Sequence, residues 1–247
     1  MNRRWDVGGF LLSAWLLSGC AFSSPTARLD AYLGPVSAPD RSVEVCVPRD
    51  AGLLVVHDTT GKGSLPPQSV DGLRSLSARI KPLAERALPL NVVKIATPVV
   101  DAGDTRTVLW KRVAEEQGVG VFLLAVVSVV EVTGADQFPF DGTQEGGGAM
   151  GVLPGRWASD YALVELGLLD TKANRLLARA EGRGSATLEQ LATDLSSNAY
   201  PVIRQPGNAR RIFPPRDGSA PQSLVAVVAI EEALGQALDK LPRCPNR

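Results

Sequence analysis

Histidine and cysteine are scarce in this sequence, which has one His and three Cys among its 247 residues. Any imidazole chemistry must therefore run through His57, and one histidine without a free pair of cysteines does not make a zinc site. The sequence also has no Gly-x-Ser-x-Gly elbow to supply a nucleophile for that histidine. We therefore expect no metal, no cofactor and no catalytic residue, and a structural hydrogen bond as the role of His57.

Neither sign of charge is in excess, because 26 Lys and Arg residues balance 26 Asp and Glu residues. Contact with nucleic-acid phosphates needs a basic face, so this balance argues against a nucleic-acid partner. Hydrophobic residues make up 45% of the chain and charged residues 21%, which is ordinary for a globular protein. That apolar content can form one core of domain size, and we expect a single domain at residues 42–247.

Residues 1–19 have the three parts of an export signal. Arg3 and Arg4 give a positively charged start, Phe10–Leu17 forms an apolar core, and small residues precede Cys20. The apolar core is too short to span a bilayer as a permanent helix, which takes about 20 residues. Twin-arginine export is the alternative interpretation of the two arginines.

The segment Leu17–Cys20, with the sequence Leu-Ser-Gly-Cys, resembles the processing box of bacterial lipoproteins. In that family the cysteine receives a diacylglyceryl thioether, so the resemblance implies a lipid anchor on Cys20. Several acyl chains hold a protein stably at a membrane without a transmembrane helix. The resemblance also implies the periplasmic face of the outer membrane, because Ala21 stands where Asp marks inner-membrane retention. Residues 20–41 are expected to form a flexible linker.

The most apolar and most β-branched stretch of the mature chain, Val121–Val132, predicts a central strand with helices on both faces. A buried helix is the alternative for so apolar a run. Upstream of it, two strands alternate with two helical patterns, which predicts parallel strands joined by right-handed crossovers. These upstream elements are expected at Leu53–His57, Pro66–Ala87, Val92–Ala96 and Thr105–Gln117.

Downstream of the central strand, Asp160–Asp170 alternates and a polar turn leads into Arg175–Ala180, which predicts an antiparallel hairpin. A short helix is expected at Thr187–Leu195 and a final helix at Val227–Leu241. The predicted fold class is therefore α/β, with a mixed sheet from β-α-β-α-β, an antiparallel hairpin and a C-terminal helix packed on the sheet. Long loops are expected at residues 133–159 and 196–221.

This order of elements is similar to the α/β module of envelope lipoproteins such as the curli secretion lipoprotein. It is also similar to the amino-terminal domain of the translocation protein TolB. The segments Tyr161–Asp170 and Asn174–Leu177 resemble the lipoproteins called rhombotarget. These resemblances imply a fold more than a function.

Two other patterns bear on chemistry. Gly61–Ser64 follows a predicted strand in the manner of a phosphate-binding loop, but Pro66 and Pro67 remove amide donors where a helix should present them. We interpret that segment as a plain loop. Glu131 and Glu165 could face each other on adjacent strands, which would raise the pKa of one of them, and solvated positions at the sheet end are the alternative.

The two thiols that remain once Cys20 is modified are Cys46 and Cys244. The predicted compartment is oxidising, so we expect a disulfide between them. It would pin the last helix to the entry of the first strand. Two buried free thiols are the alternative.

The predicted loop at residues 133–159 is far longer than most connections in a compact sheet, so we expect it to carry function. It contains Phe138, Phe140, Met150 and Trp157 among glycines and acids, and aromatic residues are enriched at partner-binding surfaces. The alternative is that these rings fold back onto the sheet edge. We expect a non-enzymatic envelope lipoprotein that binds another envelope component. A periplasmic hydrolase or small-ligand-binding lipoprotein that uses His57 and this loop is the alternative.

Overall fold

The computed structural model describes residues 24–37, 49–61, 63–66, 70–96, 106–142, 149–192, 199–214 and 221–242. All three cysteines lie outside these residues. Acylation of Cys20 and a disulfide between Cys46 and Cys244 therefore stay predictions.

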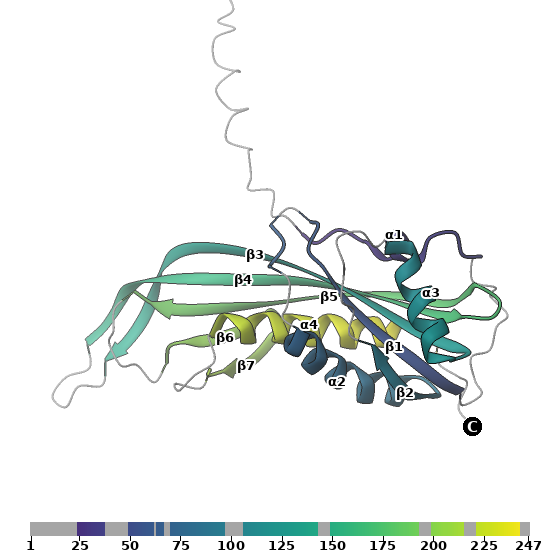
Figure 1. Cartoon of the computed structure of the whole chain (residues 1–247). Coiled ribbons are helices and arrows are strands. Elements are labelled where there is room, and N and C mark those ends of the chain that lie inside the picture. Colours follow the sequence, from purple (N-terminus) through teal and green to yellow (C-terminus); the bar gives the residue numbers. More distant parts are fainter. Residues whose placement is uncertain are drawn as a thin grey trace, which may run out of the picture.

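The described residues form one seven-stranded mixed sheet in the order β2-β1-β3-β4-β5-β6-β7 (Figure 1). The strands are β1 (Arg49–Asp58), β2 (Leu90–Ala96), β3 (Val121–Gly142), β4 (Ala149–Asp170), β5 (Arg175–Leu191), β6 (Val202–Gln205) and β7 (Asn208–Ile212). The helices are α1 (Leu29–Leu33), α2 (Val70–Ala87), α3 (Arg106–Gln117) and α4 (Pro221–Lys240).

Strand β3 begins at Val121 and lies inside the sheet, between β1 and β4, as the apolar run predicts. It pairs in parallel with β1, which in turn pairs in parallel with β2. Strands β4 and β5 then add antiparallel partners through a turn in which Asn174 has a φ of 47°. The α/β fold class, with its mixed sheet, hairpin and C-terminal helix, is confirmed.

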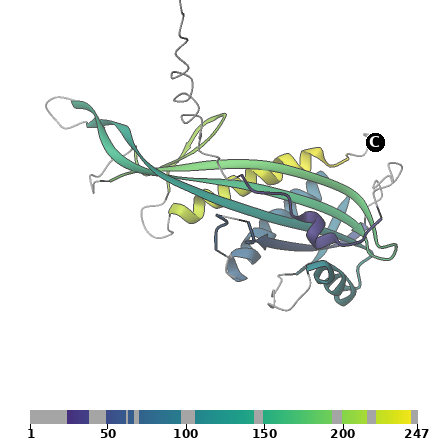
Figure 2. The ribbon, with the colours of Figure 1, turned by 90° about the horizontal axis from the view of Figure 1, so that it is seen from above.

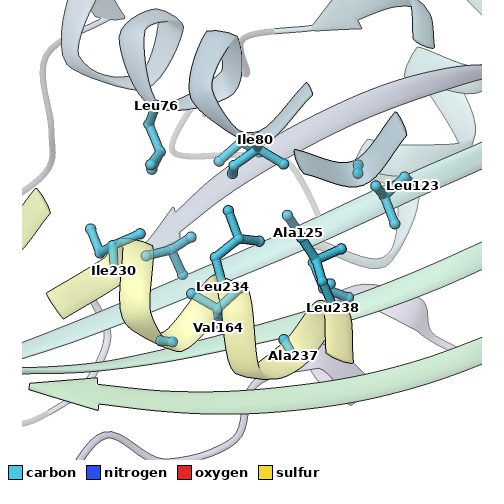
Figure 3. Packing of buried hydrophobic residues seen from close by; sticks show 14 of the residues in the cluster. Leu76, Ile80, Leu123, Ala125, Val164, Ile230, Leu234, Ala237 and Leu238 are labelled. Atoms are coloured by element: carbon cyan, nitrogen blue, oxygen red, sulfur yellow. The ribbon is translucent and has the colours of Figure 1, made fainter. Parts of the chain in front are cut away.

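Helices α2 and α4 cover one face of the sheet (Figures 1 and 3). Leu76 and Ile80 of α2 and Leu234 and Leu238 of α4 pack on alternate residues of β1, β3 and β4 such as Leu123. Each such side chain contributes about 1.5–3 kcal/mol when it is fully buried. This two-helix layer forms the main core.

Helices α1 and α3 cover the opposite face of the sheet (Figure 1). Trp110 of α3 is buried beside Phe122 of β3, and its indole N–H donates to the carbonyl of Leu33 in α1 at 3.3 Å. Leu29 of α1 is completely buried in the same cluster. The segment that contains α1 is therefore part of the folded domain, and the expected flexible linker at residues 20–41 is wrong for residues 24–37.

Two other expectations about the C-terminal half are wrong. The predicted short helix at Thr187–Leu195 is wrong for residues 187–191, which end β5, because Ala186 and Leu188 alternate into the main core; residues 193–195 lie outside the described part. The predicted loop at 196–221 contains β6 and β7, which extend the sheet antiparallel beyond β5. The final helix is confirmed as α4.

Candidate functional site

Strands β3 and β4 continue together well beyond the end of β1 (Figures 1 and 2). Their pairing runs without a bulge from Val121–Asp170 to Gly142–Ala149. We call residues 132–142 and 149–159 the distal ribbon. The expected loop at 133–159 is therefore wrong for the residues that the structure describes, and only 143–148 lies outside them.

Aromatic rings lying over glycines explain why this segment forms strands. Gly134 is paired with Trp157, and a Cβ atom on Gly134 would lie 2.5 Å from a ring carbon of Trp157. A Cβ atom on Gly155 would lie 2.5 Å from a ring carbon of Phe138. Because these glycines have no side chain, the rings can lie directly on the backbone at Gly134 and Gly155.

One face of the distal ribbon is closed by a small apolar cluster. Phe138 is 7% exposed and lies 5.6 Å, between ring centroids, from Tyr200. Val202 completes the buried part, and the Tyr200 hydroxyl donates to the carbonyl of Pro139 at 3.2 Å. Trp157 is half-buried against the cluster.

The four predicted interaction residues therefore have different positions. Phe138 and Trp157 pack on the sheet, which was the alternative interpretation of these rings. Phe140 lies in β3 and Met150 in β4, near the tip of the ribbon, and their side chains are outside the described part of the structure. The spacing of Phe138 and Phe140, two residues apart, is the local feature that indicates a strand here.

The other face of the distal ribbon is exposed. Val152 is 61% exposed, the highest value among the large apolar side chains in the described part of the chain. It pairs with Pro139, and Gln137 pairs with Pro154 beside it. All four side chains are exposed, and so is Arg156 one pair further along. This surface is mainly apolar and carries one positive charge.

The outer edge of β3 is open along the distal ribbon. Beyond β1, the backbone N–H of Leu65 donates to Val129 at 3.0 Å, and that of Glu131 donates to Gly63 at 3.4 Å. The backbone N–H and C=O groups of every second residue in a strand point to the same side. Those of Thr133 and Ala135, on the same side as those of Val129 and Glu131, therefore point away from β4. Within the described residues, no strand or side chain pairs with them.

Helix side chains protect parts of the β5 and β2 edges. Along β5, Glu232 accepts from the backbone N–H of Ser185 at 3.2 Å, and Lys240 donates to the carbonyl of Glu181 at 2.9 Å. On β2, Glu85 of α2 accepts from the backbone N–H of Val92 at 2.8 Å. Exposed strand edges invite pairing with other chains, and proteins usually block them. The edge of β3 at Thr133 and Ala135 differs in this respect from the blocked positions on β2 and β5.

Two carboxyl groups meet where the distal ribbon begins. Glu131 of β3 is directly paired with Asp160 of β4, so the possible pairing of Glu131 with Glu165 does not occur. Asp160 is 1% exposed, and its Oδ1 atom has no hydrogen-bond partner among the described residues. Burial and, second to it, the neighbouring charge of Glu131 raise the pKa of Asp160 to about 7.

Replacing Asp160 by Asn is expected to change how stability depends on pH. The raised pKa means that folded protein keeps the Asp160 proton between about pH 4 and 7, while the unfolded chain loses it. The free energy of unfolding therefore falls as pH rises through this range. The free energy of unfolding of Asp160→Asn, relative to that of the wild type, should increase by about 4 kcal/mol between pH 4 and pH 8. A pKa raised by about three units corresponds to that energy.

Urea denaturation at several pH values measures this effect. Glu115→Gln, at an exposed position on α3, is the control and should leave the pH profile unchanged. Parallel profiles for Asp160→Asn and the wild type would contradict a buried carboxyl that titrates near neutral pH.

Glu165, the second predicted carboxylate, has a different environment. It is 1% exposed and accepts hydrogen bonds from the backbone N–H groups of Arg28 and Leu29, the latter at 2.9 Å. Arg179 also donates to it at 3.3 Å and forms an ion pair with Asp30 at 2.7 Å. Glu165 thus fixes α1 on the sheet. Nothing in the local sequence connects these residues, which are more than 130 positions apart.

His57 and Asp58 lie at the end of β1 and point to opposite faces of the sheet. Asp58 accepts from the Tyr32 hydroxyl at 2.9 Å, and from the backbone N–H and the hydroxyl of Thr60 at 2.9 and 2.6 Å. Burial alone would raise the pKa of Asp58, but these hydrogen bonds outweigh it and hold the pKa below its usual value. Burial lowers the pKa of His57, although the charge of Asp58 acts in the other direction. This geometry ties α1 to β1.

A pocket of about 160 Å³ opens beside the first described residues. Its lining includes Ser24, Tyr161, Arg183 and Glu232. In the described part of the chain, no group of three or more His, Cys, Asp or Glu side chains could hold a metal ion. Among the same residues, no helix is long and apolar enough to cross a membrane.

Comparison with known proteins gives only distant likenesses. No family model matches the sequence, and no curated protein matches it. A neuraminyllactose-binding haemagglutinin homologue from Helicobacter pylori aligns with a TM-score of 0.29 and 8% identity, over 61% of this chain and 66% of that one.

Two other solved structures align in a similar way. A PelC variant from Paraburkholderia phytofirmans, described as a dodecamer, has a TM-score of 0.29 and 14% identity, over 83% of this chain and 94% of that one. Lipoprotein GNA1162 from Neisseria meningitidis has a TM-score of 0.27 and 14% identity, over 61% of this chain and 88% of that one. TM-scores this low carry no argument about function.

Proposed function

We propose that this chain is a non-enzymatic lipoprotein that uses the distal ribbon to bind another component of the cell envelope. The lipid anchor is proposed at Cys20, at the periplasmic face of the outer membrane, from the lipoprotein box and the apolar core before it. The observation that carries the binding role is the open edge of β3 at Thr133 and Ala135, which contrasts with the blocked edge positions Val92 on β2 and Ser185 on β5.

The binding mode that fits this edge is strand addition. An extended segment of a partner would pair with the outward N–H and C=O groups of Thr133 and Ala135. Ala135 and Gln137 of β3, on the exposed face, would contact its side chains. The edge is short, because the side chain of Asp136 accepts from the N–H of Gln137 at 2.7 Å and Pro139 has no N–H. Such limits reduce non-specific pairing.

Replacing Ala135 by Pro tests strand addition. The substitution removes an outward N–H that has no partner in the described fold, so the free energy of unfolding should change by less than about 1 kcal/mol. Partner recovery should be lost when the lipidated protein is cross-linked in cells, purified and identified by mass spectrometry. Ala135→Ser keeps the N–H and should keep the partner. Equal recovery with Ala135→Pro and Ala135→Ser would contradict the proposal.

A further inference from the structure

The N-terminal segment from residue 24 to residue 37 has a fixed place on the face of the sheet that carries α1 and α3. The carbonyl of Pro25 accepts from Arg183 at 3.4 Å, and the N–H of Leu29 donates to buried Glu165. At the other end, the N–H of Leu176 donates to Ser37 at 3.2 Å. The segment is therefore held at several points along its length, and its first described residue, Ser24, lies beside Tyr161 and Arg183.

The predicted lipid attachment site is close to this fixed point. Cys20 and Ser24 are separated by four Cα–Cα steps of about 3.8 Å each, so they lie no more than about 15 Å apart in any conformation. The acyl chains on Cys20 would insert into the bilayer, which would hold Cys20 itself at the level of the phospholipid headgroups. The bilayer surface must then pass within that distance of Ser24. A linker of 20 or more residues would impose no such restriction.

The side chains around Ser24 suit a phospholipid surface. Arg183 of β5 is exposed on the same face as α1, next to the docked segment, and Arg179 on that face is ion-paired with Asp30 and Glu165. Guanidinium groups bind phosphate well, and each basic residue near an anionic membrane surface contributes about 1 kcal/mol. Helix α2 lies on the other side of the sheet, beneath the main core.

We infer that the face of the sheet bearing α1, Arg179 and Arg183 lies against the phospholipid headgroups, and that α2 and the exposed face of the distal ribbon point away from the membrane. The alternation of side chains along β3 places Ala135 and Gln137 on the side of Val129, which packs under α4. The partner-binding face proposed above would then be directed into the periplasm. This inference rests on the proposed lipid anchor.

The orientation is tested with the full-length lipidated protein in phospholipid vesicles that contain a phospholipid with a photoreactive headgroup. After illumination, mass spectrometry locates the lipid adducts and also reports whether Cys20 carries its lipid. Adducts should concentrate, several-fold, on peptides that contain Arg28, Arg179 and Arg183 relative to the α2 peptide with exposed Ser75 and Arg79. The Cys20→Ala protein is the control for untethered contact and should give few adducts.

The outcomes separate the orientation from the anchor. A lipidated protein with adducts mainly on α2 and α4, or spread equally over both faces, overturns the orientation and leaves the anchor in place. A mass that shows unmodified Cys20 overturns the anchor and the orientation together. In the Arg183→Gln variant, the yield of lipid adducts on the peptides with Arg179 and residue 183 should fall while the melting temperature stays within a few degrees. That result supports direct headgroup contact.

Discussion

Gly182→Ala is expected to destabilise the domain by about 3 kcal/mol or more, because α4 packs directly on the backbone of β5 at this glycine. A Cβ atom on Gly182 would lie 2.5 Å from the backbone nitrogen of Ala237 and even closer to the carbonyl oxygen of Ala233. These are backbone atoms in the middle of a helix, so they cannot rotate away. Helix α4 would have to shift, and its buried residues Ile230, Leu234 and Leu238 would leave their sites in the main core.

The measurement is the free energy of unfolding in urea. Gly151→Ala is the matched control, because it is also a strand glycine and its Cβ atom would meet no heavy atom within 4 Å. The control should change stability by less than about 1 kcal/mol. Equal stability of Gly182→Ala and Gly151→Ala would show that α4 does not lie as close to β5 as the structure has it.

Leu29→Ala is expected to cost about 2–4 kcal/mol of stability, although the residue lies in a segment that the sequence predicts to be a flexible linker. Leu29 is completely buried, and its side chain lies over Gly167 of β4, where an added Cβ atom would be 3.4 Å from it. Loss of the side chain would leave a cavity between α1 and the sheet. It would also loosen the backbone N–H groups that satisfy Glu165.

Thr26→Ala is the control in the same segment, because Thr26 is exposed and should tolerate the change within about 0.5 kcal/mol. Thermal melting of the two variants beside the wild type gives the comparison. If Leu29→Ala melted like Thr26→Ala, the segment would behave as a free linker. The distance limit between Cys20 and the folded domain would then no longer hold.

The general fold could be predicted from the sequence because its signals are local and repetitive. The run from Val121 is apolar on both pleat faces, which only a strand between two helix layers needs. The helical periodicity of α2 and α4 and the polar turn around Asn174 could also be recognised without knowledge of the tertiary structure. These features predict the central strand, the two helices and the β4–β5 hairpin.

The distal ribbon could not be predicted because its strand residues include four that usually indicate loops. Gly134 lies under the ring of Trp157 and Gly155 under the ring of Phe138, and the sequence does not reveal these contacts. Pro139 and Pro154 lie where no backbone N–H is needed: Pro139 faces the open edge, and Pro154 lies just beyond the end of β5 pairing at Leu191. Each residue is compatible with a strand only in this tertiary context.

The polar clusters were missed for a related reason. Asp160 and Glu131 become neighbours only through the register of β3 on β4, and Glu165 finds its donors in α1, far away in sequence. The sequence suggested that two carboxylates would meet across these strands, but it could not identify the pair. A difference of five residues in register decides which acid faces Glu131.

The most direct test of the binding proposal is a photo-crosslinking amino acid placed at Gln137, on the exposed face beside the open edge, in cells that make the lipidated protein. The same amino acid at exposed Ser75 on α2 is the control. The proposal predicts a discrete adduct with one partner chain at Gln137, its loss in the Ala135→Pro variant, and no such adduct at Ser75. Absence of an adduct at Gln137, or the same adduct at both positions, would contradict it.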